Sequence, residues 1–261
     1  MALEIRVDGK VALITGATQG IGLAVAETLA RSGASGLLLT GRDAARGEAA
    51  AATFARSGTP AVFVAADLGD AEAPARLVAA CGDRFGRIDA LVNAAALTDR
   101  AGLLDAGLDD WARLFAVNAR APFFLMQHAV AAMRQQGGGS IVNILSTNVH
   151  CGQPDLAVYT ATKAALAAIT KNAANAHRFD RIRINGINVG WALTPGEDVM
   201  QSKTLGNGPD WAERAAATLP FGRLLMPQEV ANLAVFLVSD ASGPMTGSLI
   251  DQEQWVPGSR A

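Results

Sequence analysis

The sequence lacks most of the features that would set it apart from an ordinary globular protein. It has two cysteines, Cys81 and Cys151, so a disulfide framework is not expected and a reducing cytoplasm is the expected compartment. No apolar run reaches the roughly 18 residues that a membrane span needs. The first residues lack the basic and apolar regions of a secretory signal. The net charge of −2 carries no basic surplus, which argues against nucleic acid or an anionic membrane as a partner.

What the chain does have is apolar sequence in a regular alternation. Half of its residues are hydrophobic, which is ample for a buried core. Short, nearly continuously apolar segments are typical of parallel strands covered on both faces, and longer alanine-rich segments between them are typical of helices. The predicted strands are residues 11–15, 37–40, 61–65, 90–93, 140–145, 182–188 and 248–250. The predicted helices are about residues 20–32, 43–57, 71–85, 109–135, 156–177 and 227–238.

This alternation predicts the fold class. Strand and helix at this spacing give right-handed crossovers and an α/β, Rossmann-type doubly wound parallel sheet of about seven strands. No repeat or linker divides the chain, so residues 1–261 are expected to form a single domain. Residues 190–226 break the rhythm, with glycines, prolines and two tryptophans but no strand. Because loops of this length are usually functional, we predict a substrate lid here, with an ordinary surface loop as the alternative.

A glycine-rich turn follows the first predicted strand, and a helix opens directly after it. Glycines allow positive φ angles and let the backbone approach a bulky ligand. The helix N-terminus then offers free N–H groups and a positive dipole end to a pyrophosphate. This strand–turn–helix context predicts dinucleotide binding, with a purely structural turn as the alternative. The predicted contacts in the turn are Gly16, Thr18, Gln19, Gly20, Ile21 and Gly22.

Three further residues are candidates for proton transfer. Tyr159, the single tyrosine of the chain, lies four residues before Lys163 in a predicted helix, so both lie on one face. A phenol has a pKa of about 10, and a neighbouring ammonium brings that pKa toward neutrality. Ser146 ends a predicted strand at the ligand-binding edge of the sheet, where its hydroxyl could stabilise a developing alkoxide. The alternative for the Tyr-x-x-x-Lys pattern is a plain surface pair.

Together, the Gly-x-x-x-Gly-x-Gly turn, the strand-end serine and the Tyr-x-x-x-Lys pair resemble the short-chain dehydrogenase/reductase family, from residue 9 to about 255. The resemblance implies that Tyr159 is the general acid/base and that Ser146 holds the substrate oxygen. It implies that Lys163 binds the nicotinamide ribose and lowers the tyrosine pKa. Asn118 matches the family asparagine that supports a proton-relay water.

The resemblance also implies several cofactor contacts. Asp67, followed by Leu68, matches the acidic residue that contacts adenine, with a helix cap as the alternative. Asn93 matches the first residue of the family's Asn-Asn-Ala-Gly turn beside the adenosine, although here three alanines follow it. Thr194, four residues after Gly190, matches a threonine that contacts the carboxamide.

The residues after the second predicted strand bear on the choice of cofactor. A carboxylate there favours NAD, whereas an arginine accommodates the 2′-phosphate of NADP. Gly41 occupies the acidic position and Arg42 follows, which resembles the NADP-preferring members. Asp43 complicates this interpretation, and Gly36 looks like an insertion that could shift the register. NADP(H) is therefore favoured and NAD(H) remains possible, while a solvated helix start with Asp43 as N-cap is the alternative.

These residues predict an NAD(P)-dependent oxidoreductase that interconverts a secondary alcohol and a ketone by hydride transfer. Polyols, sugar-derived ketones, hydroxy acids and 3-oxoacyl thioesters are all substrates in the resembled family. Trp191, Asp198 and Trp211 favour a polar, sugar-like ligand, with aromatic residues that simply bury the lid as the alternative. The alternatives are a cofactor-retaining epimerase or lyase and a non-catalytic NAD(P)-binding protein on the same fold.

No metal site is predicted, because His150 and Cys151 stand side by side without further ligands and are expected to be pocket-wall or loop residues. Cys81 is expected in the core. The resemblance implies a homotetramer, and the alanine-rich faces of residues 109–135 and 156–177 permit close helix packing in a homo-oligomer. A dimer or a monomer is left open.

Overall fold

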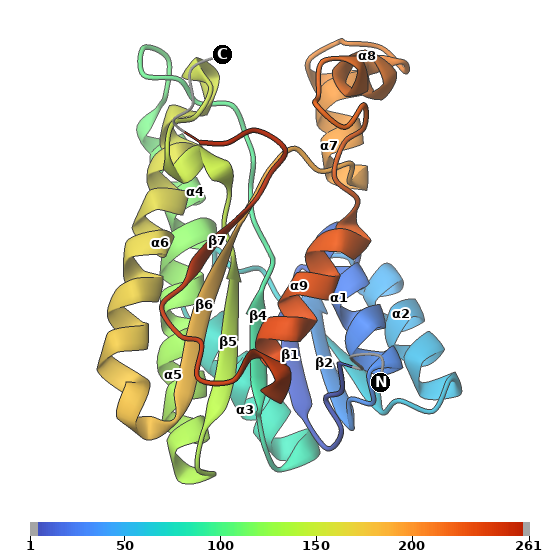
Figure 1. Cartoon of the computed structure of the whole chain (residues 1–261), viewed down its shortest axis with the longest axis vertical. Coiled ribbons are helices and arrows are strands. Elements are labelled where there is room, and N and C mark those ends of the chain that lie inside the picture. The colour runs from blue at the N-terminus through green and yellow to red at the C-terminus, as the bar shows by residue number, and fades with distance from the viewer. Residues whose placement is uncertain (1–4, 258–261) are drawn as a thin grey trace.

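The computed structural model describes residues 5–257. Residues 1–4, which belong to the N-terminal segment that is not expected to be a secretory signal, lie outside the described range, as do residues 258–261. Seven strands form one sheet in the order β3-β2-β1-β4-β5-β6-β7 (Figure 1). Every neighbouring pair is parallel, so the predicted Rossmann-type sheet is confirmed. The strands are β1 (Val11–Thr15), β2 (Gly36–Gly41), β3 (Ala61–Ala65), β4 (Ala90–Asn93), β5 (Gly139–Ile144), β6 (Ile182–Val189) and β7 (Leu249–Gln252).

Helices cover both faces of this sheet, as Figure 1 shows. One face carries α1 (Gly20–Arg31), α2 (Ala44–Arg56) and α9 (Pro227–Val238). The other face carries α3 (Ala73–Phe85), α5 (Ala121–Gln135) and α6 (Ala157–His177), with α4 (Leu108–Phe115) leading into α5. Among the described residues, no helix is both long and apolar enough to cross a membrane.

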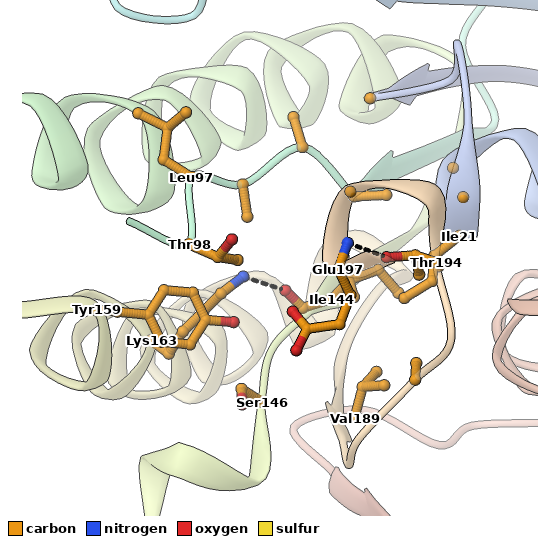
Figure 2. A pocket seen from close by; sticks show the side chains of 18 of the residues that line it. Ile21, Leu97, Thr98, Ile144, Ser146, Tyr159, Lys163, Val189, Thr194 and Glu197 are labelled. Atoms are coloured by element: carbon orange, nitrogen blue, oxygen red, sulfur yellow. Dashed lines mark hydrogen bonds between the residues drawn. The ribbon is translucent and has the colours of Figure 1, made fainter. Parts of the chain in front are cut away.

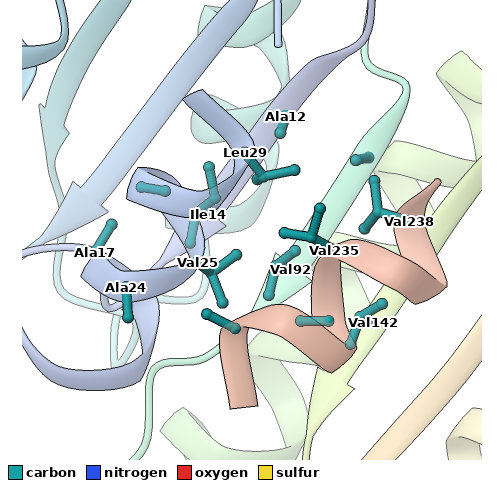
Figure 3. Packing of buried hydrophobic residues seen from close by; sticks show 14 of the residues in the cluster. Ala12, Ile14, Ala17, Ala24, Val25, Leu29, Val92, Val142, Val235 and Val238 are labelled. Carbon is teal, nitrogen blue, oxygen red and sulfur yellow. The ribbon is translucent and has the colours of Figure 1, made fainter. Parts of the chain in front are cut away.

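The two helical layers explain why the strands are apolar on both faces. In β1, Ile14 packs in one cluster with Val25 of α1 and Val235 of α9 (Figure 3). Its neighbour Leu13 points the other way, into the cluster that contains Leu125 of α5. Because successive strand residues face opposite layers, both must be apolar for the sheet to be buried.

The helix predicted over residues 109–135 is interrupted. The structure has α4, then a π-helical turn at Ala116–Arg120, then α5. Pro122 lies in the first turn of α5 and has no N–H to donate to the carbonyl four residues earlier, which belongs to Asn118. The apolar pattern therefore predicts a continuous helical segment here, but it does not reveal the change in hydrogen bonding within that segment.

Residues 190–226 form a small helical unit at the carboxyl edge of the sheet, seen at the upper right of Figure 1. It contains α7 (Pro195–Val199), a π-helical turn (Met200–Thr204) and α8 (Trp211–Ala217). Trp211 is 3% exposed and packs with Ala215 and Leu224 in a cluster separate from those of the sheet. An isolated β-bridge between Ala192 and Leu225 closes the base of the unit.

Candidate active site

A cleft of about 620 Å³ opens at the carboxyl edge of the sheet. Its walls are the turn after β1, the loops after β2 to β5, one face of α6, part of the segment 189–219, and the chain after β7. Ligands of doubly wound folds bind at this edge. The cleft brings together most of the predicted site residues, namely Gly16, Thr18, Gln19, Gly20, Ile21, Gly22, Arg42, Asp67, Leu68, Ser146, Tyr159, Lys163, Gly190 and Thr194.

The glycine turn is built of backbone packed on backbone. Gly16 and Gly20 have φ angles of +66° and +57°, which residues other than glycine rarely adopt. A Cβ at Gly22 would collide with the carbonyl of Gly16 and lie 2.9 Å from the carbonyl oxygen of Thr15. Helix α1 starts here without a side-chain cap and without an acidic residue in its first turn. Its free N–H groups and positive dipole end suit the pyrophosphate of a dinucleotide.

The two charged residues in the loop after β2 have different surroundings. Arg42 lines the cleft. Asp43 instead caps α2, accepting from the backbone N–H of Arg46 at 3.0 Å and pairing with the Arg46 Nε at 3.1 Å. A Cβ at Gly41 would lie 2.8 Å from the Thr18 Cγ2, so an acidic side chain at position 41 would have to displace Thr18.

Gly36 does not shift the register of β2. It pairs with Val11, and Thr40 pairs with Thr15, so the register is unbroken along the whole of β1. A Cβ at Gly36 would come within 2.7 Å of the Phe85 ring, which explains the glycine by packing.

Tyr159, Ser146 and Lys163 meet in the cleft, as Figure 2 shows. The Ser146 hydroxyl acts on Tyr159 as a hydrogen-bonding neighbour and lowers the pKa of its phenol. The Ser146 Oγ also accepts from the backbone N–H of Asn148 at 3.2 Å. Lys163 reaches under the tyrosine, donates from Nζ to the carbonyl of Ile144 at 2.8 Å, and lies 5.7 Å from the centre of the tyrosine ring. The sheet edge and the helix face thus converge on one point.

Burial dominates the acid–base properties of this group. It raises the pKa of Tyr159 to about 12; the hydrogen bond with Ser146 lowers this pKa, the charge of Glu197 raises it, and that of Arg100 lowers it. Burial lowers the pKa of Lys163 to about 8, so the ammonium is still mostly charged at neutral pH. The phenol is therefore a proton donor in this state, and the predicted effect of Lys163 on its pKa stays a prediction.

Asn118 is one of two predicted site residues that do not line the cleft. It lies in the π-helical turn and is completely buried. Its side chain bridges two elements: it accepts from the backbone N–H of Leu97 at 2.8 Å, and donates to the carbonyl of Leu97 at 2.9 Å and to the Thr162 hydroxyl at 3.1 Å. Both amide hydrogens and one lone pair of the amide oxygen are thus engaged, and the backbone carbonyl of Asn118 is left by Pro122 without its α-helical donor.

Asn93 is the other residue outside the cleft. It is 2% exposed and donates to the Asn143 Oδ1 at 2.8 Å, beneath the floor of the cleft. The floor itself is formed by residues 94–96, whose first two N–H groups donate to the Thr15 Oγ1. Among the described residues Arg181 is the only non-glycine residue with positive φ, so the missing family glycine after Asn93 leaves no backbone strain.

Asp67 and Thr194 line the cleft and also serve local structure. The Asp67 Oδ1 accepts from the backbone N–H of Gly69 at 2.8 Å, and the Thr194 Oγ1 accepts from that of Glu197 at 3.1 Å as the N-cap of α7. At Gly190 a Cβ would collide with the carboxylate of Glu253. The structural roles of Asp67 and Thr194 are therefore shown, and their contacts with a cofactor stay predictions.

Several charged or polar side chains that line the cleft were not predicted from the sequence, among them Arg100, Glu197, Gln201 and Glu253. The pattern from Thr194 to Glu197 is that of a capping box, in which the glutamate would reach back to the helix start. In the structure Glu197 turns away from the cap and into the cleft. No local pattern singles out Arg100.

Other predicted candidates lie elsewhere. Neither His150 nor Cys151 lines the cleft, and the His150 Nε2 lies 3.0 Å from the Asp251 Oδ1. Trp191 lines the cleft, whereas the Trp211 Nε1 donates to the Asp198 Oδ1 at 2.8 Å within the helical unit. Cys81 is fully buried, as expected for a core residue. Among residues 5–257, no group of three or more His, Cys, Asp or Glu side chains could hold a metal ion.

The fold and the position of the cleft define a Rossmann-type enzyme class, and sequence comparison gives the family. A profile described as enoyl-(acyl carrier protein) reductase matches residues 16–252. The chain belongs to the short-chain dehydrogenase/reductase family and is an oxidoreductase.

Three relatives illustrate the breadth of that family. Sorbitol dehydrogenase of Cereibacter sphaeroides is 37% identical over 247 residues, covering 90% of this chain and 92% of the relative. A 3-oxoacyl-[acyl-carrier-protein] reductase of Thermotoga maritima is 33% identical over 246 residues, covering 94% and 97%. The crystal structure of L-sorbose reductase from Gluconobacter frateurii, in complex with NADPH and L-sorbose, has a TM-score of 0.92 at 32% identity and covers 99% of this chain and 100% of that one.

Proposed function

We propose that the protein catalyses the NADP(H)-preferring interconversion of a secondary alcohol and a ketone, with Tyr159 as general acid/base. The observation that carries this proposal is the convergence of the Tyr159 and Ser146 hydroxyls and the Lys163 ammonium in the same cleft as an uncapped helix N-terminus. Proton transfer and dinucleotide binding need these groups at a single site.

The residues of the cleft fit a nicotinamide dinucleotide. The turn from Gly16 to Gly22 would hold the pyrophosphate with backbone N–H groups. Asp67 and Leu68 would lie against the adenine, with Asn93 supporting the alanine floor beside the adenosine from below. Gly190 and Thr194 would lie against the nicotinamide, which supplies or accepts the hydride when bound.

A preference for NADP(H) follows from the loop after β2. Arg42 lines the cleft, while Asp43 is engaged in capping α2. A guanidinium suits a 2′-phosphate, and the acidic side chain that would bind a ribose diol is absent at Gly41. The complex of L-sorbose reductase with NADPH supports the same preference.

In the reduction direction Tyr159 would donate its hydroxyl proton to the carbonyl oxygen as the hydride reaches the carbonyl carbon. Ser146, whose oxygen already accepts from Asn148, would direct its own hydrogen to the substrate oxygen. Lys163 would hold the nicotinamide ribose and stabilise the phenolate left behind. The backbone carbonyl of Asn118 would hold the water that returns a proton.

Residues 190–226 would act as a lid over the substrate, since Gly190, Trp191, Thr194 and Glu197 line the cleft from this segment. The homo-oligomer implied by the family stays a prediction.

A screen of purified protein tests the proposal. Polyols, hydroxy acids, sugar-derived ketones and 3-oxoacyl compounds are offered with both cofactors, and the nicotinamide absorbance is followed. A dehydrogenase changes the absorbance in proportion to product formed. Product without net absorbance change would indicate an epimerase or lyase, and cofactor binding without product from any substrate would overturn the proposed activity.

A further inference from the structure

Glu197 is held in the cleft by a chain of side-chain hydrogen bonds. Its Oε1 accepts from the Trp191 Nε1 at 2.9 Å and from the Gln201 Nε2 at 2.7 Å. The amide of Gln201 is itself oriented, because its Oε1 accepts from the Asn207 Nδ2 at 2.7 Å. Three residues of one helical unit thus fix the position of one carboxylate, which is the arrangement expected of a preorganised binding group.

The second oxygen of this carboxylate is free to bind a ligand. Among residues 5–257 no protein group donates a hydrogen bond to the Glu197 Oε2. Figure 2 shows the carboxylate pointing toward the hydroxyl of Tyr159. The charge of Glu197 acts on Tyr159, so the two groups belong to the same end of the cleft. An ionised carboxylate only accepts hydrogen bonds, and its partner must therefore carry an O–H or N–H group.

A positive side chain lines the same cleft as this carboxylate. Arg100 lines the cleft with 19% of its side chain exposed, and its Nε lies 3.3 Å from the Asp155 Oδ2. Like Glu197, it acts electrostatically on Tyr159. An anionic substrate held at Arg100 would face the negative charge of Glu197, whereas a neutral molecule with several hydroxyls can satisfy both, because a hydroxyl donates and accepts.

We infer that Glu197 selects the substrate by accepting a hydrogen bond from a hydroxyl close to the reacting carbon, so that the enzyme acts on small neutral polyhydroxy ketones and the polyols formed from them. This inference rests on the proposed function and adds the substrate class to it. Trp191 and Gln201 are positioning residues for the carboxylate.

A carboxylate at this position distinguishes between substrate classes that all occur in the family. A plain ketone or an apolar acyl chain at this position would leave the carboxylate desolvated without a donor, which disfavours binding. A polyhydroxy ketone supplies the donor. The cost of the missing hydroxyl is that of a hydrogen bond to a charged group, or about 10- to 100-fold in affinity.

The test compares L-sorbose with 2-hexanone as substrates of the wild type and of Glu197→Gln, at saturating NADPH. Glu213→Gln is the matched control, since it removes the same charge from an exposed position on α8. We expect Glu197→Gln to raise KM for L-sorbose about 10- to 100-fold with kcat within about threefold, and to change kcat/KM for 2-hexanone by less than about threefold. Glu213→Gln should match the wild type on both ketones.

A pH profile and a binding measurement add independent readouts. Removing the Glu197 charge lowers the pKa of Tyr159, so the loss of reductase activity at high pH should begin at lower pH in Glu197→Gln and be unchanged in Glu213→Gln. Calorimetry with D-sorbitol and protein loaded with NADP⁺ should show weakened binding in Glu197→Gln alone. If Glu197→Gln does not fold, Trp191→Phe removes one donor and should raise KM for L-sorbose while kcat is kept.

Three results would overturn the inference. Equal losses of kcat/KM with L-sorbose and 2-hexanone in Glu197→Gln would mean that Glu197 does not bind a substrate hydroxyl. A rise in KM for NADPH would mean that Glu197 serves the cofactor. Wild-type preference for an acyl or anionic carbonyl compound would contradict the substrate class while leaving the proposed oxidoreductase activity intact, whereas failure to reduce any carbonyl compound would contradict the proposed function itself.

Discussion

The two walls of the cleft are built in different ways. The wall beside the glycine turn is backbone against backbone, and a Cβ at Gly16 would lie 2.9 Å from both the Cα and the N of Ala95. The wall formed by residues 190–226 is made of side chains, with the rings of Trp191 and Trp211 5.9 Å apart and Glu197 facing the cleft. A backbone wall leaves little room for substitution and suits a ligand shared by a family. A side-chain wall can change without disturbing the sheet.

The largest effect should follow from Gly22→Ala in the backbone wall. The added Cβ would collide with the carbonyl of Gly16, which is part of the turn and has little freedom to move. We expect NADPH affinity to fall at least about 100-fold, together with a destabilisation of about 1–3 kcal/mol. Nucleotide fluorescence and urea unfolding measure the two effects.

Gly82→Ala provides the control for this variant. Gly82 lies in α3, and a Cβ there would meet no atom within 4 Å. This substitution should leave NADPH affinity unchanged and stabilise the helix by up to about 1 kcal/mol. Equal NADPH affinity in both glycine variants would contradict the description of a rigid cofactor wall.

The next test separates the stability of the sheet from that of the helical unit formed by residues 190–226. Leu13→Ala removes a fully buried side chain of β1 and should destabilise the fold by about 2–5 kcal/mol. Trp211→Ala empties the small cluster of the helical unit, which is separate from the clusters of the sheet. We expect it to lower kcat/KM about 10- to 100-fold while the main unfolding transition moves less than in Leu13→Ala.

Urea denaturation followed by circular dichroism, together with steady-state kinetics, measures both variants. A main transition as strongly shifted in Trp211→Ala as in Leu13→Ala would mean that the lid is part of the same cooperative unit as the sheet.

Arg42→Ala should have a smaller and more selective effect. Loss of the guanidinium should raise KM for NADPH about tenfold and leave KM for NADH within about twofold, because only NADPH carries the 2′-phosphate. Arg56→Ala, near the far end of α2, is the matched control and should affect neither cofactor. Equal effects of Arg42→Ala on both cofactors would overturn the proposed preference.

The smallest effect concerns the ion pair at the end of the lid segment. Hydrogen bonds from Arg223 hold the pKa of Glu229 at about 2, well below the value of the unfolded chain. A carboxyl group whose pKa is lower in the folded protein than in the unfolded chain stabilises the fold at pH values above the unfolded pKa. This contribution is lost as the pH falls toward about 2. Because 49% of the Arg223 side chain and 34% of the Glu229 side chain are exposed, solvent screens the pair and its contribution to stability should be small.

Urea midpoints of the wild type and Glu229→Gln, measured between neutral pH and strongly acidic pH, test this pair. The difference between the two proteins should shrink on acidification. A difference that grows instead would show that the pair does not contribute in this way.

The fold could be predicted well because each strand is marked by its own short apolar segment of the sequence. Strands buried on both faces read as apolar runs, and the three predicted strands 11–15, 61–65 and 90–93 have the predicted bounds. The π-helical turn in the helix predicted over residues 109–135 was missed. The apolar period persists through the turn, and only the hydrogen-bond pattern changes.

The site could be predicted where a residue follows a strand or shares a helix turn with another. Ser146, Tyr159 and Lys163 meet for that reason. Asn93 does not line the cleft, because its side chain faces Asn143 of the neighbouring strand, a contact that depends on sheet order. Glu197 was missed because its partners are set by how the lid folds, and the sequence pattern favours a helix cap at that position.

Tyr159→Phe, which removes the hydroxyl and keeps the ring, tests most directly whether this phenol transfers the proton. We expect kcat/KM to fall about 10²- to 10⁴-fold while the dissociation constant for NADPH changes by less than about twofold. Turnover within about tenfold of the wild type, with NADPH binding unchanged, would contradict the claim that this phenol transfers the proton.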